Sequence, residues 1–290
     1  MIVATHRRPQ SMMRLLSSLA PQFDPLRHEL IIAENGTPTP SQFDAAGIPI
    51  THLHDSRAGK CRVQNRAIAQ ARGRIIACLD DDLVAGADYL AEVQRFFEHY
   101  PQYAAMKGRI LPAEDPAIKA GTMAPYLDLP IVDHGEDVVE VRGVMGANMA
   151  FRAAALRQVG PFDERLGPGA AGHEEETEMS QRMRRAGFRI GYAPRAVVFH
   201  EVDPSRAVRE RFLRVARERG FCRILHESHS RAEVELAVAV ATVRVAIARA
   251  LASPIIRLAR EERRLAVAQG MRDGLFKQAA NAAARVNDDR

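Results

Sequence analysis

Short apolar runs alternate with amphipathic stretches through the first hundred residues of the chain. The runs have the length of strands, and the stretches between them repeat apolar residues at spacings of three and four, which is typical of helices. The predicted order is strand, helix, strand, strand, helix, strand, helix, which indicates an α/β fold with a mainly parallel central sheet. The predicted strands are 1–4, 29–33, 48–53 and 75–79, and the predicted helices are 12–19, 58–71 and 89–100.

The apolar pattern is less regular after residue 103. The segment 112–137 contains several prolines and shows little periodicity, so we expect a loop without regular structure on the substrate side. Short apolar runs in this half predict strands, and apolar residues at helical spacing predict helices. The predicted strands are 106–111, 138–145, 148–151, 189–192 and 196–199, and the predicted helices are 153–159 and 173–185.

A helical extension closes the chain, and we place the boundary between a first domain, 1–204, and this extension, 205–290. The segment 233–252 is predicted as one helix with an apolar stripe whose residues lie three and four apart. Pro254, directly after Ser253, predicts the start of a second helix that ends near Gly270. The stripe consists of Leu236, Val240, Val243, Ile247 and Leu251.

Two partners for this stripe stay open from the sequence. The stripe can pack on the first domain or form a homodimer, or it can dock on anionic lipid together with the arginines of the second helix. We favour packing, because the stripe lacks the Trp and Phe residues that interfacial helices often carry.

The charge of the chain is unevenly distributed. The formal net charge is +5, but the extension holds 18 Lys and Arg against 10 Asp and Glu, so the remainder is slightly acidic. Aromatic residues do not interleave with these basic residues, which argues against a nucleic-acid partner. The three cysteines have no metal-ligand spacing, and their odd number favours a reducing compartment. We expect neither a signal peptide nor a membrane-spanning helix. The expected location is therefore the cytoplasm, with peripheral attachment to the inner face of the membrane as the other option.

Three carboxylates follow the most apolar predicted strand, 75–79. Asp80, Asp81 and Asp82 repel one another unless a cation lies among them. In open α/β sheets, ligands bind beyond the carboxyl ends of the strands. Mg²⁺ is usually held by one or two carboxylates together with substrate phosphates, so this cluster indicates a divalent cation that carries phosphate oxygens. A solvated acidic turn before a helix is the alternative.

A second acidic cluster opens the predicted helix 173–185. Glu175 and Glu176 lie near its start and arginines lie near its end, which the helix dipole favours on its own. A carboxylate at the edge of a pocket can also act as a general base. His200 follows the last predicted strand, where it serves either a structural role or as a ligand.

Several stretches, taken in order along 1–202, resemble the motifs of the family 2 glycosyltransferases. The DxD-like 79–82, the ED-like 175–179 with Arg182, and 192–200 with its terminal histidine are the parts that carry chemistry. The other matching stretches are 5–9, 59–66, 146–152 and 159–164. The resemblance implies the GT-A fold, a nucleotide-diphosphate sugar donor, inversion of the anomeric centre, and a saccharide, lipid-linked or small-molecule acceptor.

The resemblance also implies roles for individual residues. Asp80, Asp82 and His200 would hold Mn²⁺ or Mg²⁺, with the imidazole favouring Mn²⁺. Glu176 would be the general base, with Glu175 as the other candidate, because Glu176 stands where the family usually has Asp. Gln64 stands where an Arg commonly precedes the Asn, so phosphate charge would be met elsewhere. The donor would contact Thr5, His6, Arg7, Glu34, Lys60, Arg62, Asn65, Asp80 and Asp81, with Glu34 accepting a hydrogen bond from the nucleotide base.

Two other functions are compatible with part of this pattern. A nucleotidyltransferase that acts on a sugar phosphate would use similar aspartates, but it usually has a glycine- and arginine-rich loop after the first strand, which 5–9 does not supply. A non-catalytic module that binds a nucleotide sugar would not need both Glu176 and His200 after the aspartates.

Overall fold

The chain folds into two compact units in the computed structural model, which describes residues 1–37, 43 and 47–288, with side chains described up to residue 281. The sheet unit comprises 1–114, 129–170 and 175–202, and the helical unit comprises 115–128, 171–174 and 203–290. The helical unit therefore takes in two short excursions of the chain besides the C-terminal helices.

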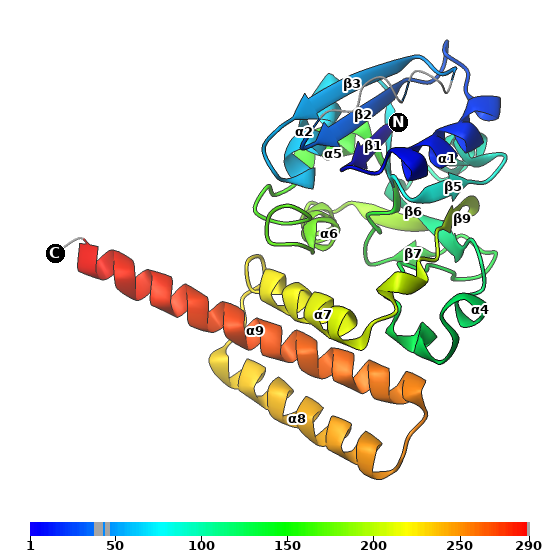
Figure 1. Cartoon of the computed structure of the whole chain (residues 1–290). Coiled ribbons are helices and arrows are strands. Elements are labelled where there is room, and N and C mark those ends of the chain that lie inside the picture. Colours follow the sequence, from blue (N-terminus) through cyan, green and yellow to red (C-terminus); the bar gives the residue numbers. More distant parts are fainter. Residues whose placement is uncertain (38–42, 44–46, 289–290) are drawn as a thin grey trace. The chain divides into compact units, whose positions relative to one another are not determined.

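One sheet runs through the sheet unit, in the order β3-β2-β1-β4-β8-β6-β9-β5, with β7 beside β9 (Figure 1). Strands β3, β2, β1 and β4 are parallel neighbours, while β8 is antiparallel to both β4 and β6. The predicted α/β fold with a mainly parallel sheet is thus confirmed. The strands are β1 Ile2–Thr5, β2 Leu30–Asn35, β3 Ile50–Asp55, β4 Ile75–Asp80, β5 Leu83–Ala85, β6 Tyr103–Pro112, β7 Glu140–Val141, β8 Asn148–Arg152 and β9 Arg189–His200.

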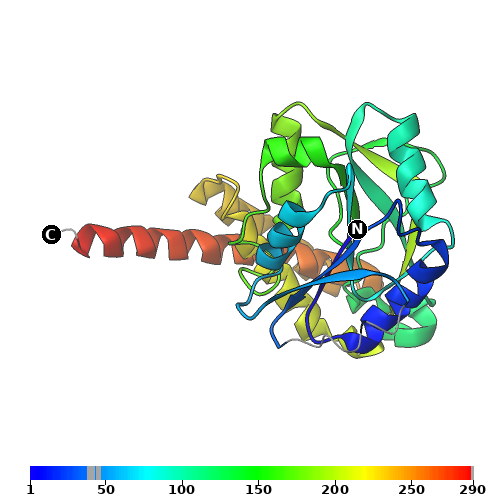
Figure 2. The same ribbon diagram turned by 90° about the horizontal axis from the view of Figure 1, so that it is seen from above.

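Helices cover both faces of this sheet (Figure 2). Successive residues of a strand point to opposite faces, so Val3 packs with α1 and α3, whereas Ile2 packs with α2, α5 and α6. Burial on both faces explains why the central strands read as continuous apolar runs. These helices are α1 Pro9–Leu19, α2 Lys60–Gln70, α3 Tyr89–His99, α5 Ala153–Val159 and α6 Glu175–Arg185.

Three predictions for the sheet unit differ from the structure. The predicted strand 138–145 is wrong apart from Glu140–Val141, because the backbone N–H of Val144 donates to the Ser180 hydroxyl instead of to a neighbouring strand. The predicted strands 189–192 and 196–199 form one strand, β9, whose register against β6 shifts after Ala193 and thereby accommodates Pro194. Strand β5 was not predicted, because it has only three residues.

The helical unit consists mainly of α7 (Arg209–Arg223), α8 (Arg231–Ala250) and α9 (Ile255–Asp288). Helix α9 packs against both of the others, and its last turns extend beyond them (Figures 1 and 2). The excursion 115–128 forms α4 (Pro116–Ala120) and a 3₁₀ turn, so the prediction of a structureless loop over 112–137 is wrong for this part. No helix among the described residues is long and apolar enough to cross a membrane.

Helix α9 does not end near Gly270, as the sequence had predicted. A Cβ atom on Gly270 would lie 1.9 Å from the carbonyl oxygen of Arg217, and one on Gly220 would lie 1.9 Å from that of Val267. The two glycines therefore allow the backbones of α7 and α9 to cross in close contact, which is the role of small residues where helices approach. Gly270 therefore allows α9 to pack closely on α7 and does not end the helix.

The predicted stripe of α8 is not the face that packs in the helical unit. Helix α8 packs against α9. Its buried residues are Val234, Val238, Ala241, Val245 and Ala248. The stripe residues Leu236, Val240, Val243, Ile247 and Leu251 are 44–67% exposed. Helix α8 is apolar on two opposite faces, so the periodicity alone identified one apolar face and missed the one that packs.

Candidate active site

Polar side chains gather where four parallel strands of the sheet end. Thr5 at the end of β1 lies beside Glu34 of β2, and Ala4 lies beside Asp80 of β4. Asp55 at the end of β3 extends the same edge next to Asn35. Because the carboxyl ends of parallel strands meet at one edge, the fold brings together residues far apart in the sequence.

Asp81 and Asp82 share one arginine. Arg8 Nη1 lies 3.1 Å from Asp81 Oδ1 and 2.7 Å from Asp82 Oδ2. The Thr5 hydroxyl donates to Asp81 Oδ2 at 2.6 Å. Burial raises the pKa of Asp81, although Thr5 and Arg8 act in the opposite direction. A side chain of this sheet unit thus supplies part of the positive charge that the aspartate cluster needs.

Arg8 was not among the residues expected from the sequence, which pointed to Thr5, His6 and Arg7. The backbone of Arg7 has φ of +54°, and its side chain is exposed. This turn lets Arg8 reach the aspartates, while His6 Nδ1 contacts the carbonyl oxygen of Asn35 at 2.7 Å. Two consecutive arginines leave the choice between them to the backbone conformation, so no sequence signal could have decided it.

A partly buried lysine joins the first aspartate to the second acidic cluster. Lys60, at the start of α2, places Nζ 2.6 Å from Asp80 Oδ1 and 3.8 Å from Glu175 Oε1. Burial works against ionising Asp80, but Lys60 outweighs it and keeps the pKa of this carboxyl below its ordinary value. The pKa of Lys60 is raised in turn, because Asp80 and Glu175 overcome the effect of its burial.

Glu174, directly before α6, and Glu175 and Glu176, in the first turn of α6, have different surroundings. Glu174 belongs to the helical unit, where its carboxylate lies 3.7 Å from both Arg223 and His226. Glu175 is 6% exposed, and burial, then the charge of Glu176, raise its pKa to about 8. Glu176 is half-buried, so of the two glutamates in the sheet unit it is the more accessible.

His200 and Asp82 form a pair of adjacent donor atoms, with Nε2 3.4 Å from Oδ1. His200 Nδ1 lies 2.8 Å from the carbonyl oxygen of Glu201, which can only accept, so Nδ1 carries a proton. In a neutral imidazole, Nε2 then turns a lone pair toward the carboxylate of Asp82. Nε2 and Oδ1 are then two adjacent acceptor atoms, a pair that a metal ion can bind.

The structure does not combine Asp80, Asp82 and His200 into one set of three ligands. Among the described residues, no group of three or more His, Cys, Asp or Glu side chains could hold a metal ion by itself. Asp82 and His200 fit a site in which the protein gives two ligands and phosphate oxygens give the rest, as is usual for Mg²⁺ at phosphate sites.

The remaining donor-side candidates are occupied by protein contacts. Glu34 is 1% exposed, and its Oε2 lies 2.9 Å from His52 Nε2. Both polar atoms of the Asn65 amide bond the backbone of Phe162 at 2.9 Å. Arg62 pairs with Glu164 at 3.3 Å. In this structure these side chains hold the sheet unit together at the rim of the site.

Lys107 is a second cation that sequence reasoning missed. It lies on β6 opposite Met149 and Tyr192. Burial lowers its pKa, and the carboxylate of Glu176 partly offsets this effect. Only the strand pairing brings Lys107 toward the acidic cluster, so no local motif could have identified it.

Comparison with known proteins identifies the family. The model of the family described as Glycosyl transferase family 2 matches residues 1–160, which is more than half of the chain. The chain belongs to glycosyl transferase family 2. The match covers β1 to β8, and with them Asp80, Asp81 and Asp82.

Two curated relatives are similar to this chain over part of their length. The glucosyl-dolichyl phosphate glucuronosyltransferase of Haloferax volcanii is 26% identical over 200 residues, which are 64% of this chain and 62% of the relative. The pre-mycofactocin glycosyltransferase of Mycobacterium tuberculosis is 27% identical over 184 residues, which are 59% of this chain and 37% of the relative. The chain thus spans less than two thirds of the length of either relative.

Solved structures share the GT-A fold at low sequence identity. The mannosyltransferase PcManGT of Pyrobaculum calidifontis, in complex with GDP-Man and Mn²⁺, is 17% identical, with a TM-score of 0.56 over 99% of this chain and 78% of its own. TarS 1–349 of S. aureus, in complex with UDP-GlcNAc, is 14% identical, with a TM-score of 0.55 over 96% and 91% of the two chains. The predicted GT-A fold with C-terminal helices is confirmed.

Proposed function

We propose that this chain is an inverting glycosyltransferase that moves a sugar from a nucleotide-diphosphate sugar to an acceptor hydroxyl. The proposal rests on the aspartates and His200 at one edge of the sheet of a family 2 chain, and on Glu176, whose charge acts on Lys60 beside Asp80. The similar solved structures in complex with GDP-Man or UDP-GlcNAc support the donor class.

In this proposal, the charge of the leaving diphosphate is met by protein cations and by a divalent ion. Arg8 and Lys60 bond the aspartates. Both cations therefore lie beside the carboxylates near which the phosphates would bind. Asp82 and His200 would hold Mn²⁺ or Mg²⁺. When bound, such an ion neutralises charge on the leaving phosphate oxygens as a Lewis acid.

Glu176 would take the proton of the acceptor hydroxyl. It is accessible, whereas Glu175 is buried and, with a pKa of about 8, carries its own proton at neutral pH. Neutral Glu175 beside Lys60 keeps a negative charge out of the buried interior. Direct attack of the hydroxyl on the anomeric carbon, on the side opposite the diphosphate, forms one bond as the other breaks and inverts the centre.

A screen of UDP- and GDP-sugars tests the donor class. A nucleotide sugar that binds the folded chain raises its melting temperature, and with an acceptor it releases nucleoside diphosphate. Asp82→Asn should abolish the dependence of binding on Mn²⁺, while Asp133→Asn, at an exposed aspartate, should not. Absence of stabilisation and turnover with every nucleotide sugar would refute the proposal.

A pair of variants tests the base. Glu176→Gln should keep donor affinity and lose about 10²- to 10⁴-fold in transfer rate, the usual contribution of a general base. Glu175→Gln should retain most of the transfer, because its carboxyl is already protonated. The reverse result would assign the base to Glu175. The anomeric configuration of the product, read by NMR, tests inversion separately.

The acceptor is a saccharide, a lipid-linked sugar or a small molecule. The Haloferax volcanii relative is named for glucosyl-dolichyl phosphate, a lipid-linked sugar, which supports the lipid-linked class. The same assay with water-soluble and lipid-linked acceptors separates these classes.

A further inference from the structure

Helix α8 exposes a continuous apolar surface. Its stripe runs along the whole helix on the face opposite the contact with α9, and two more isoleucines, Ile255 and Ile256, are exposed where α9 begins. Large apolar side chains are common at the protein surface as single residues, but contiguous patches mark sites of interaction. A helix that is apolar on both faces is usually covered on both.

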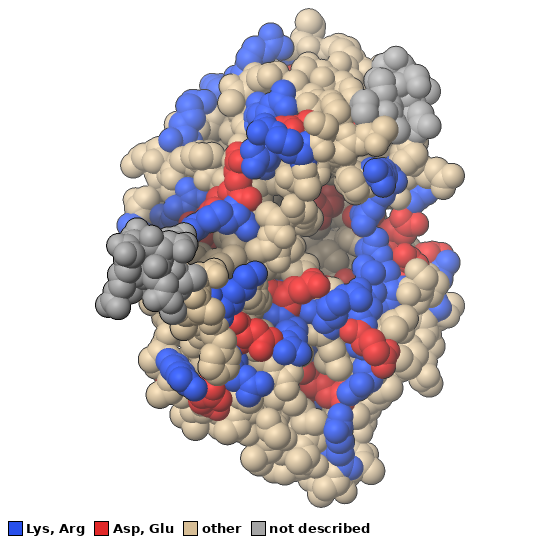
Figure 3. All heavy atoms as spheres, turned by 60° about the vertical axis from the view of Figure 1, so that its left-hand side comes forward, with Lys and Arg blue, Asp and Glu red and all other residues tan. Residues whose placement is uncertain are grey.

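Between residues 236 and 260, a segment that holds the stripe, the charges of the chain have one sign, while Glu233 and Glu235 precede it. From residue 236 to residue 260 the chain contains no Asp or Glu. It contains four arginines in the same segment, and all of them are exposed: Arg244, Arg249, Arg257 and Arg260. On the face of the molecule in Figure 3, Lys and Arg mix with Asp and Glu over most of the area.

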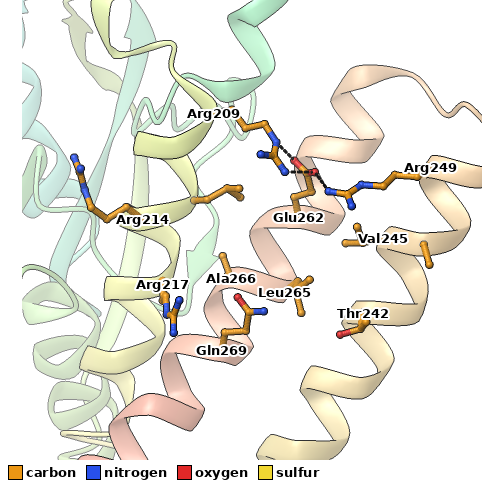
Figure 4. A pocket seen from close by; sticks show the side chains of 12 residues that line it. Arg209, Arg214, Arg217, Thr242, Val245, Arg249, Glu262, Leu265, Ala266 and Gln269 are labelled. Atoms are coloured by element: carbon orange, nitrogen blue, oxygen red, sulfur yellow. Dashed lines mark hydrogen bonds and ion pairs between the residues drawn. The ribbon is translucent and has the colours of Figure 1, made fainter.

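A groove of about 540 Å³ borders the stripe within the helical unit. Thr242 and Ala246 of α8 form one wall, and they are sequence neighbours of Val243 and Ile247. Figure 4 shows Arg209 of α7 and Arg249 of α8 reaching the same carboxylate, that of Glu262. The lining thus holds four arginines and one acid, although Arg217 also pairs with Asp273, which lies outside the lining. Its lining residues are Arg209, Leu213, Arg214, Arg217, Thr242, Val245, Ala246, Arg249, Glu262, Leu265, Ala266 and Gln269.

We propose that the stripe of α8, with its arginines and the arginine-lined groove, docks the chain on the surface of an anionic lipid bilayer. The aliphatic side chains would enter the boundary between headgroups and acyl chains, and the arginines would meet lipid phosphates. The helix lies in the plane of this surface, because no described helix is long and apolar enough to cross it.

A second copy of the chain is the less suitable occupant. A twofold contact places the same surface against itself. The middle of the stripe is at Val243, so a symmetric contact of this kind would put the two copies of Arg244 side by side, and the segment 236–260 offers no acid to pair with them. Anionic headgroups provide the complementary charge.

Vesicle flotation of the full chain, without donor or acceptor, tests the proposal. The chain should float with phosphatidylcholine vesicles that contain phosphatidylglycerol, and less with phosphatidylcholine alone. Val243→Ser combined with Ile247→Ser should lower the partition coefficient by about tenfold or more, because burial of one aliphatic side chain contributes about that much. The matched control, Leu26→Ser with Ile118→Ser, removes two residues that are 94% and 83% exposed elsewhere and should leave it unchanged.

A charge variant tests the electrostatic part. Arg244→Gln should lower binding to the anionic vesicles about fivefold at low salt and leave binding to neutral vesicles unchanged. Equal partition of the stripe variant and the control variant would overturn the proposal. It would also be overturned by a dimer in sedimentation equilibrium that the stripe variant dissociates, or by a lowered melting temperature of that variant, since the stripe would then be covered by protein. Vesicle binding is measured without turnover, so failure of the sugar-transfer assay does not affect this result.

Discussion

Replacement of Lys60 by Met tests whether the partly buried ion pair between Lys60 and Asp80 is formed in solution. Lys60 Nζ contacts Asp80 Oδ1 at 2.6 Å, and its side chain is 15% exposed. Methionine has a similar length and fills the same space, so the variant removes the charge and the hydrogen bond with little change in packing. It leaves Asp80 without its nearest cation.

The expected loss follows from the surroundings of Asp80. Removal of one partner of a buried pair costs about 3–5 kcal/mol, because the other charge stays buried without compensation. Asp80 is 30% exposed, so water can reach it and the lower end of this range applies. We therefore expect a loss of about 3 kcal/mol, or on the order of 6–12 °C in melting temperature for a chain of this size.

Circular dichroism is the suitable assay, because the chain has no Trp to report unfolding by fluorescence. The control Lys119→Met removes an exposed lysine and should change stability little. The double variant Lys60→Met with Asp80→Asn removes both charges and should recover much of the loss. A single variant that loses less than about 1 kcal/mol, or a double variant that loses the sum of both single losses, would refute the buried pair.

Two further predictions concern Glu175 and the crossing of α7 and α9. The carboxyl of Glu175 titrates at about 8 in the folded chain and near 4.5 when unfolded, so the folded state binds its proton more tightly and stability falls as the pH rises from 4.5 through about 8. Glu175→Gln should remove this pH dependence of the free energy of unfolding, measured with urea, a change of a few kcal/mol at most. If the free energy of unfolding of the variant varied with pH as before, the raised pKa would be excluded. Gly270→Ala should destabilise the folded chain. The clash at 1.9 Å costs about 1–3 kcal/mol or more, whereas the higher helix propensity of alanine contributes only about 1 kcal/mol. Gly274→Ala, where the nearest contact would be 3.1 Å, should be milder in thermal melts, and equal melting temperatures for the two variants would contradict the close crossing.

The sequence identified those parts of the site that depend on neighbouring residues. The run 75–79 and the three aspartates after it are local features, and the structure has β4 and the acidic edge at this place. The same holds for the acidic start of α6. A buried parallel strand and a helix with acid at its first turn each leave their signal within a few residues.

The sequence could not identify contacts that depend on backbone conformation or on strand pairing. Arg8 rather than Arg7 reaches the aspartates because of the positive φ at Arg7. Lys107 comes near Glu176 only through the pairing of β6. Gly270 read as a helix end, since a helical pattern does not show whether a glycine faces a neighbouring backbone. Each miss concerns a tertiary relation that no local pattern contains.

The composition of the helical unit from three separate segments affects how the protein is made and recombined. Tyr126 and Asp128, in the first excursion, bond Glu262 and Arg219 of the C-terminal helices. During synthesis, the excursion leaves the ribosome well before the C-terminal helices. Its contacts with Glu262 and Arg219 therefore form only after those helices have been made. The chain passes between the two units five times. No single cut therefore separates them, and a chimera that exchanges 203–290 with the tail of a relative must exchange 115–128 and 171–174 as well.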